Sequence, residues 1–455
     1  MPYEGEYATY RPLHRISECQ RVKGLLARSK LLEAGRATYA PRPVEAPPQS
    51  PILPHFILAI DGSYAEVDVK NGYPGAKVGY CTAASVLLDL NLIGQLDTKR
   101  PVDPVEFRKT EQAASVDAAL PGSNVVTRRQ NSARASFREE LYDLFTDIVV
   151  DEDDRTNLLS TYEALLVLKP TANPQSCPYK ESHDCSANFM VGPGCTTCPT
   201  CGRPVYSTDA LRIHERFRDI GTNGEAFGLV MQVIERLLVV HFLRCFERRN
   251  LLQRLTSLAF FIDGPLASFG PPAWLSAAIG KELKRINQKV RSSAGQDLLI
   301  LGIEKTGAFV QHFEEIDQTE TPGQQLFSAR QYILLTDRYI KERILHSDSH
   351  KRYGEDTYFG RKFFYKTQSN ARIVASIPFL TDAQDTLDSD DISLYPQFAT
   401  VCSVLDRVVS SRYANAVSPL IAANAQAAIP LQLGSKVLTQ LARALLGTAE
   451  NDSLR

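Results

Sequence analysis

Two aspartates occur in closely similar settings in distant parts of the sequence. Asp61 follows the apolar run of "LAIDGSY" (58–64), and Asp263 follows that of "FFIDGPLA" (260–267). Asp-Gly is a common turn dipeptide, so one copy alone would indicate only a turn. Two copies, each after a buried strand, predict carboxylates at the carboxyl ends of two strands, where open α/β sheets bind ligands, and the carboxylates lie side by side if those strands are neighbours. Such close carboxylates stay ionised together only around a cation, and oxygen ligands favour Mg²⁺ or Mn²⁺. The pair therefore predicts a divalent-metal site suited to phosphoryl transfer.

A third carboxylate is expected from the helix that leads into the strand of Asp263. Glu235 lies in "VMQVIERLLVV" on an apolar stripe, so its charge requires a partner. Two partners explain this position equally well: a metal ion, or an arginine such as Arg236 or Arg216 in a salt bridge. Glu247 and Glu225 on the same helix remain alternatives to Glu235.

Five of the nine cysteines fall within residues 177–201. Cys198-Pro-Thr-Cys201-Gly is a tight turn in which two thiolates reach one zinc ion. The second pair of ligands must come from Cys177, Cys185, Cys195 or His183. We expect Cys177 and Cys185, which precede the turn as a separate pair, with Cys195 as the alternative. Four protein ligands leave no open position, so the zinc would be structural. We expect it to stabilise a small insertion, and the alternative is a ribbon that grips DNA or docks a partner.

A basic segment, residues 350–366, alternates aromatic and cationic side chains. Such a pattern suits base stacking and phosphate contact on a single nucleic-acid strand. It predicts Arg361 and Lys362 as DNA-binding residues. The other basic run, residues 281–291, is typical of a solvated helix face.

Alternating strand and helix patterns predict an α/β sheet that positions these residues. Strands are expected at 55–61, 79–91, 257–263, 297–307, 362–367 and 372–380, and helices at 136–149, 155–168, 225–255, 272–291, 398–411 and 434–447. A helix over 11–34 and a proline-rich arm over 40–54 precede the main domain. Residues 97–135 are polar and mixed, and no element is predicted there. The expected boundaries are 1–54 for the N-terminal helix and arm, 55–445 for the main domain, and 175–215 for a zinc-binding insertion within it.

Composition narrows the class of protein. The chain has 455 residues, 44% hydrophobic residues and a formal net charge of −1, which excludes a global electrostatic attraction to polyanions. The N-terminus lacks the apolar core of a secretory signal. Residues 413–435 are weakly charged but contain proline, asparagine and glutamine, which argues against a membrane span. We expect a cytoplasmic protein.

The order of several segments resembles the NurA nucleases. The segments are "LAIDGSY", the helix with Glu235, "FFIDGPLA", "LLILGIEKTG" and "SPLIAANAQAAI", and the resemblance covers roughly residues 55–445. It implies an RNase H-like mixed sheet flanked by helices, here with the inserted zinc module. It also implies a metal-dependent DNA nuclease with 5′ to 3′ exonuclease and endonuclease action, a homodimer, and a partner, the hexameric ATPase HerA.

The resemblance also assigns residues. Asp61 and Asp263 match the first and second catalytic aspartates, and Glu235 is the best match to the helix glutamate. The family usually completes its site with a histidine, where this sequence has Asn424. An amide oxygen can bind Mg²⁺ or Mn²⁺ but cannot exchange protons as histidine does. Lys305 matches a basic family position that could hold a phosphate, and a solvated lysine explains it equally well.

Two functions follow from these residues. The paired aspartates favour a nuclease that works with a HerA-type translocase in DNA end processing or anti-phage defence. The asparagine at 424 favours a catalytically weakened scaffold that binds DNA and the ATPase.

Overall fold

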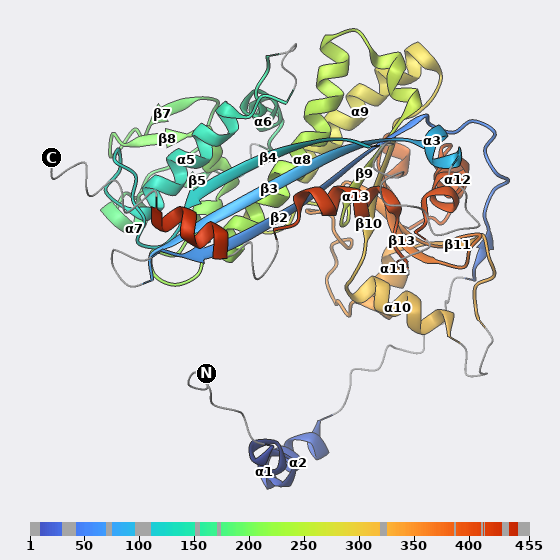
Figure 1. The fold of residues 1–455 in the computed structure, drawn as a ribbon, viewed down its shortest axis with the longest axis horizontal. Helices are drawn as coiled ribbons and strands as arrows, with labels where there is room; N and C mark the ends of the chain where they lie inside the picture. The colour runs from blue at the N-terminus through green and yellow to red at the C-terminus, as the bar shows by residue number, and fades with distance from the viewer. Residues whose placement is uncertain are drawn as a thin grey trace.

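The computed structural model describes residues 10–29, 42–69, 75–95, 111–150, 155–170, 174–318, 325–385, 388–410, 413, 415–429 and 436–444. Its main feature is a nine-stranded mixed sheet with the order β1-β11-β12-β13-β10-β9-β2-β3-β4 (Figure 1). The strands are β1 (Val44–Glu45), β2 (Phe56–Asp68), β3 (Lys77–Asp89), β4 (Glu111–Pro121), β9 (Leu258–Asp263), β10 (Leu299–Glu304), β11 (Gln331–Leu334), β12 (Gly360–Lys366) and β13 (Arg372–Pro378).

Five consecutive strands at one end of the sheet, β10, β9, β2, β3 and β4, have an RNase H-like arrangement. Strands β4, β3 and β2 are antiparallel neighbours, and β2, β9 and β10 run parallel to one another. Strand β13 then pairs antiparallel with β10 and continues the sheet through β12 and β11 to β1. The expected α/β class, with a mixed sheet flanked by helices, is therefore confirmed.

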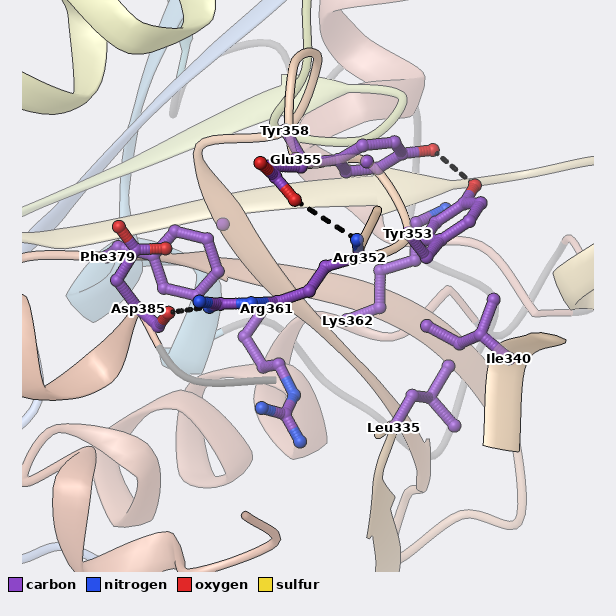
Figure 2. A pocket seen from close by; sticks show the side chains of 12 residues that line it. Leu335, Ile340, Arg352, Tyr353, Glu355, Tyr358, Arg361, Lys362, Phe379 and Asp385 are labelled. Carbon is purple, nitrogen blue, oxygen red and sulfur yellow. Dashed lines mark hydrogen bonds between the residues drawn. The ribbon is translucent and has the colours of Figure 1, made fainter. Parts of the chain in front are cut away.

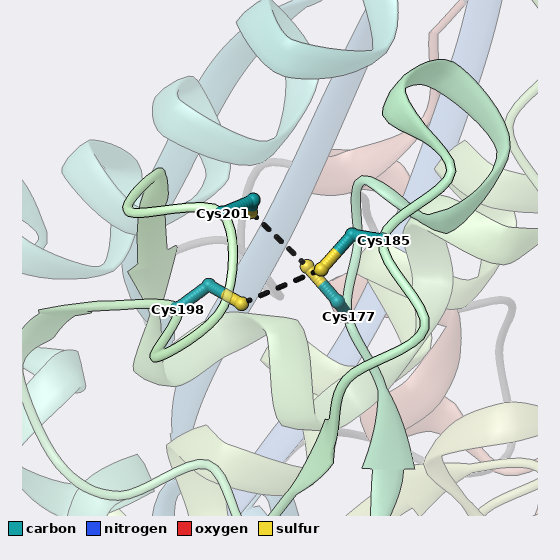
Figure 3. Close-up of side chains that lie close together, drawn as sticks. All are labelled: Cys177, Cys185, Cys198 and Cys201. Atoms are coloured by element: carbon teal, nitrogen blue, oxygen red, sulfur yellow. Dashed lines mark hydrogen bonds between the residues drawn. The ribbon is translucent and has the colours of Figure 1, made fainter.

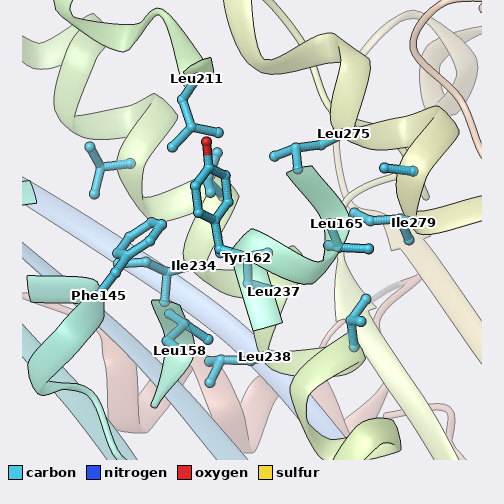
Figure 4. Packing of buried hydrophobic residues seen from close by; sticks show 14 of the residues in the cluster. Phe145, Leu158, Tyr162, Leu165, Leu211, Ile234, Leu237, Leu238, Leu275 and Ile279 are labelled. Carbon is cyan, nitrogen blue, oxygen red and sulfur yellow. The ribbon is translucent and has the colours of Figure 1, made fainter. Parts of the chain in front are cut away.

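Helices cover both faces of the sheet because each central strand is apolar on both sides. One hydrophobic cluster joins Leu58 and Ile60 of β2 to α5 (Ala133–Asp147), α6 (Leu158–Leu166), α8 (Gly224–Arg248) and α9 (Leu275–Ala294) (Figure 4). On the opposite face, Ile57 and Ala59 pack with α12 (Phe398–Val408) and α13 (Ser418–Ala427). The alternation of side chains along a strand thus divides β2 between two cores.

Further helices are short or peripheral: α1 (Arg11–Glu18), α2 (Gln20–Arg28), α3 (Leu90–Gln95), α7 (Lys180–His183), α10 (Ala308–Asp317) and α11 (Asp337–Tyr339), and residues 436–444 are also helical. Helix α10 packs Phe309 and Phe313 against Phe364 of β12 in a smaller cluster. Helix α8 is long and apolar enough to cross a membrane, but 72% of its apolar window is buried inside the protein, as in the core helix of a soluble protein.

The structure corrects the expectation that Asp61 ends its strand. Strand β2 continues through Asp61 and Gly62 to Asp68, in register with β3 along its whole length. Only the parallel pairing with β9 stops, at Ile60 opposite Ile262. Asp61 therefore lies at the end of the parallel part of the sheet but inside a longer antiparallel hairpin. Asp263, by contrast, is the last residue of β9, as expected.

Other elements differ from the expected ones. The helix predicted over 11–34 is two short helices, α1 and α2, separated at Cys19, which has an extended backbone. Strand β4 occupies part of the segment for which no element is predicted. Its residues are small and polar because it forms an exposed edge of the sheet, so they show no apolar strand pattern. The proline-rich arm contributes β1, which pairs with the edge strand β11.

The cysteine-rich segment forms two small sheets, β5 (Gln175–Ser176) with β6 (Asn188–Phe189) and β7 (Cys195–Thr197) with β8 (Pro204–Tyr206). It is fastened to the main domain by a buried ion pair between Arg138 of α5 and Asp209, at 2.6 Å. The indole N–H of Trp274 donates a hydrogen bond to the carbonyl of Ala210 (2.9 Å). The hydrophobic core of the cysteine-rich segment is thus continuous with that of α5, α6 and α8.

Candidate active site

Asp61 and Asp263 lie side by side at the centre of the sheet. Since Ile60 pairs with Ile262 in the parallel ladder, the following residues of the two strands are brought together. The Nζ atom of Lys305 lies 3.1 Å from Oδ2 of Asp61 and 2.9 Å from Oδ1 of Asp263. The two aspartates, predicted to share a cation, thus contact the same ammonium group.

Lys305 is the residue directly after β10, and this place in the chain brings its side chain to the aspartates. Strand β10 is parallel to β9, and Ile303 pairs with Asp263. The end of β10 therefore lies beside the end of β9. An ammonium held by two carboxylates shows that this point of the sheet accommodates a positive charge with oxygen ligands. The donor set fits Mg²⁺ or Mn²⁺, which prefer carboxylate oxygens.

Glu235 approaches the same point from α8, which packs across β2 and β3. Its side chain is buried, and a Cβ atom on Gly62 would lie only 2.6 Å from its Oε1 atom and 2.7 Å from Cγ of Met231. Only glycine at position 62 leaves room for this carboxylate. The backbone N–H of Gly62 also donates a hydrogen bond to Oδ1 of Asp61 (2.8 Å). The glycine after Asp61 thus serves close packing and not a turn.

Arg236 joins Glu235 to the loop after Asp263. Its guanidinium donates to Oε2 of Glu235 (3.1 Å) and to the carbonyls of Asp263, Pro265 and Ala267 (3.1–3.2 Å). The side chain is 3% exposed, so its charge is balanced inside the protein. The salt bridge predicted for Glu235 is therefore formed with Arg236, and the other carboxylate oxygen faces Gly62.

The pKa shifts reflect a crowded acidic site. Burial and the charge of Asp263 raise the pKa of Asp61 to about 6, although Lys305 acts in the opposite direction. Burial raises the pKa of Glu235 to about 8, with Arg236 opposing and Asp61 adding to the shift. Burial disfavours the charge on Lys305, but the two aspartates outweigh it and raise its pKa. Three acids and one lysine thus form a single electrostatic unit.

The alternative glutamates of α8 are engaged elsewhere. Glu247 accepts hydrogen bonds from Arg285 and Lys289 of α9 (2.6–2.7 Å), which lower its pKa to about 2 although burial opposes the shift. Glu225 lies 3.5 Å from Arg216. Glu235 is therefore the glutamate of α8 that the fold directs to the aspartates.

Comparison with known proteins identifies the family of this chain. The family model for the NurA domain matches residues 55–427, which is most of the chain. The chain belongs to the NurA family.

Solved NurA structures are distant from this family member. The NurA nuclease from Sulfolobus solfataricus is matched over 98% of this chain and 97% of that chain, with 11% sequence identity and a TM-score of 0.34. A second NurA crystal structure is matched over 96% and 95%, with 9% identity and a TM-score of 0.26. No curated protein sequence matches the chain. Membership therefore rests on the domain match, and a NurA family member is expected to be a nuclease.

Asn424, which the sequence resemblance assigns to the family's histidine position, lies on α13. This helix packs on β2, β3, β4 and β9, on the face that also carries Asp61 by strand alternation. The Asn424 side chain is exposed, and within the described part of the chain no hydrogen bond joins it to the aspartates. Ser63, two residues after Asp61, accepts a hydrogen bond from the backbone N–H of Ile429 (3.4 Å). Helix α13 and the strand of Asp61 are thus fastened together near the site.

Arg361 and Lys362 do not form the exposed DNA-binding surface that their sequence pattern predicts. They are 1% and 3% exposed, because alternation along β12 directs them to opposite faces of a covered strand. Lys362 pairs with Glu304 at 2.6 Å, and Arg361 donates to the carbonyl of Ser389 (2.7 Å). Both line a pocket of about 180 Å³ together with Arg352, Tyr353 and Tyr358 (Figure 2). A DNA strand would reach them only after the covering residues moved.

Four cysteine sulfurs converge in the inserted segment (Figure 3). The Sγ atoms of Cys177, Cys185, Cys198 and Cys201 all lie within 4.8 Å of one another. Two of the separations are 3.9 Å (Cys177 to Cys201) and 3.7 Å (Cys185 to Cys198). Ideal tetrahedral zinc with bonds of about 2.3 Å has sulfurs roughly 3.8 Å apart, so the cluster fits this metal. Cys195, the alternative ligand, is exposed and outside the cluster.

Reasoning from the sequence missed three features of the active site. Lys305 was expected to hold phosphate or face solvent, and it bridges the aspartates. No role is predicted for Gly62, and it makes room for Glu235. Arg236 was considered only as a competitor of the metal, and it also binds the loop after Asp263. The adjacency of Glu235 and Arg236 was a usable signal for that last contact.

Proposed function

We propose that this NurA family member is a divalent-metal-dependent deoxyribonuclease. The observation that carries the proposal is the convergence of Asp61, Asp263 and buried Glu235 at one point of the sheet. These residues would hold Mn²⁺ or Mg²⁺, and Asn424 of α13 would supply a further oxygen donor. Such an ion lowers the pKa of a bound water and neutralises charge on the departing phosphodiester oxygen.

The chain's own residues have distinct parts in this proposal. Asp61 and Asp263 fix the position of the cation, and Gly62 admits Glu235 as the third carboxylate. Arg236 orients Glu235 and keeps the loop after Asp263 in place. Lys305 supplies a positive charge to the phosphate that enters the site. Arg361 and Lys362 are left out of the DNA contacts because they are buried.

The resemblance to NurA nucleases supports the finer assignments. We propose 5′ to 3′ exonuclease and endonuclease action on DNA, homodimerisation, a cytoplasmic location, and cooperation with a HerA-type hexameric translocase in end processing or anti-phage defence. The cysteine cluster would hold structural zinc. The alternative is a weakened scaffold that binds DNA and the ATPase, which the asparagine at position 424 favours because it cannot transfer protons.

The test is Mn²⁺-dependent degradation of linear DNA, with and without a HerA-type ATPase. Asp61→Asn should lower the rate roughly a hundredfold or more, since even substitutions behind metal ligands cost 10–100-fold. Asp68→Asn is the matched control, because Asp68 ends the same strand and its side chain is 73% exposed. Equal inertness of the wild type and Asp61→Asn with the ATPase present would exclude the nuclease and leave the scaffold.

A second pair of variants tests the third carboxylate. Glu235→Gln should abolish Mn²⁺-dependent cleavage, whereas Glu247→Gln should retain it, because Glu247 contacts Arg285 and Lys289 away from the aspartates. The opposite result would show that the assignment of Glu235 is wrong.

A further inference from the structure

We propose that Lys305 is a resident cation that occupies the metal site of the free protein and must leave it when a divalent ion binds. The proposal rests on the proposed function, since it concerns the same Asp61 and Asp263 site. It adds a residue of this chain that sets the metal affinity.

The geometry makes the two cations mutually exclusive. The Lys305 ammonium lies 3.1 Å from an oxygen of Asp61 and 2.9 Å from an oxygen of Asp263. Mg²⁺ binds carboxylate oxygens at about 2.0–2.1 Å. An ion held by the same two oxygens would therefore lie within contact distance of Nζ, and two positive charges that close repel each other. The ammonium must move before the ion is fully bound.

The charges favour this exchange. One ammonium neutralises one carboxylate of the pair, whereas a divalent ion neutralises both. The remaining cation, Arg236, does not compete, because it contacts the opposite side of Glu235 and backbone carbonyls. Competition for the aspartates is thus confined to Lys305 within the described part of the chain.

Lys305 is also free to move in a way that Arg236 is not. Its side chain is 34% exposed and lies outside β10, and its two contacts are both to the aspartates. Arg236 is 3% exposed and makes four hydrogen bonds. A flexible four-carbon stem lets the displaced ammonium remain beside the ion. From there it would contact the phosphate, so the two roles of Lys305 follow one another.

The test is the affinity for Mn²⁺ alone, measured by calorimetry on the full chain without DNA. Lys305→Met should bind Mn²⁺ about tenfold more tightly than the wild type, which is within the usual range of coupling between sites. Lys77→Met is the matched control, because Lys77 also bridges two carboxylates, Glu66 and Asp68, on the same sheet. Its Mn²⁺ affinity should equal that of the wild type. Unchanged or weaker Mn²⁺ binding by Lys305→Met would overturn the proposal and leave Lys305 as a phosphate contact only.

A measurement on the wild type avoids the risk that Lys305→Met fails to fold. Mn²⁺ should increase the labelling of Lys305 by an amine-reactive reagent, read by mass spectrometry, while the labelling of Lys77 stays constant. Unchanged labelling of Lys305 at saturating Mn²⁺ would contradict the exchange. Failure of the proposed function is distinguishable, because it would appear as no Mn²⁺ binding by the wild type or by Lys305→Met.

Discussion

At the scale of single residues, the site depends on the size of one side chain and on the charge of a few others. Gly62 lies between Asp61 and the helix that carries Glu235, and any side chain there would occupy the place of the Glu235 carboxylate. Arg236 balances Glu235, and Lys305 balances the aspartates. The carboxylates would repel one another, so the neighbouring cationic side chains are what keep them close together.

Gly62→Ala should remove activity without touching an ionisable group. The added methyl would lie 2.6 Å from Oε1 of Glu235 and 2.7 Å from Met231, which should destabilise the fold by about 1–3 kcal/mol. Cleavage assays and Mn²⁺ calorimetry on the folded variant measure the effect. Gly192→Ala, where a Cβ atom has no neighbour within 4 Å, is the control and should behave as wild type. Full activity of Gly62→Ala would show that Glu235 is not held as described.

The metal-free protein should lose stability as the pH rises from about 4.5 to 8. The folded protein holds the proton of Glu235 more tightly than the unfolded chain does, because burial raises its pKa to about 8. Stability is therefore greatest below the unfolded pKa and falls until Glu235 is ionised in both states. Asp61, with a pKa of about 6, acts in the same direction.

Thermal unfolding at several pH values, without divalent ions, measures this dependence. Glu235→Gln should flatten the curve between pH 4.5 and 8, since the amide does not titrate. Identical pH dependence in the wild type and the variant would contradict the raised pKa of Glu235.

At the scale of elements, β2 and α8 do most of the positioning. At Asp61, the parallel pairing of β2 with β9 has stopped, whereas its antiparallel pairing with β3 continues. At this end of the parallel ladder, where open α/β sheets bind ligands, the Asp263 side chain is 32% exposed, whereas the Asp61 side chain is 2% exposed. Helix α8 lies across β2 and β3 and brings Glu235 to the same point. The cysteine-rich segment packs beside α5 through strand β8.

Each chain should contain one zinc ion. Cys198→Ser should lose it and lower the melting temperature, because the two-stranded sheets of the segment cannot form a stable core alone. Cys195→Ser should retain both zinc and stability, since Cys195 is exposed outside the cluster. Elemental analysis and thermal unfolding measure these outcomes. Loss of zinc in Cys195→Ser, or its retention in Cys198→Ser, would show that the ligand set is wrong.

At the scale of the whole molecule, one continuous sheet joins the RNase H-like strands to β13, β12, β11 and β1. The chain enters through the proline-rich arm, which contributes β1 to the far edge. The arm is also fastened by the guanidinium of Arg330, which donates to the carbonyl of Pro47 (2.8 Å), and by the Ser50 N–H, which donates to Ser403 (2.9 Å). Helices α1 and α2, which precede it, contain no buried residue.

Two truncations should therefore differ. Removal of residues 1–41 should leave the melting temperature of the main domain unchanged, whereas removal of residues 1–54 should lower it, because β1 and the contacts of Pro47 and Ser50 are lost. The loss of these few hydrogen bonds should cost about 1–3 kcal/mol. Calorimetric unfolding of the two truncated chains makes the comparison. Equal melting temperatures would show that the arm does not stabilise the sheet.

The sequence by itself determined the local features: apolar runs that form β2, β9 and β10, the long helix with Glu235, and the C-x-x-C turn. These follow from side-chain type and spacing, which act over a few residues. Strand β4 escaped prediction because its small and polar residues lie at an exposed sheet edge. Only the tertiary structure decided which charges meet. Lys305 contacts Asp61 because β10, β9 and β2 are parallel neighbours, and Arg361 is buried because both faces of β12 are covered. Such contacts depend on the pairing of distant segments, which no local pattern of residues specifies.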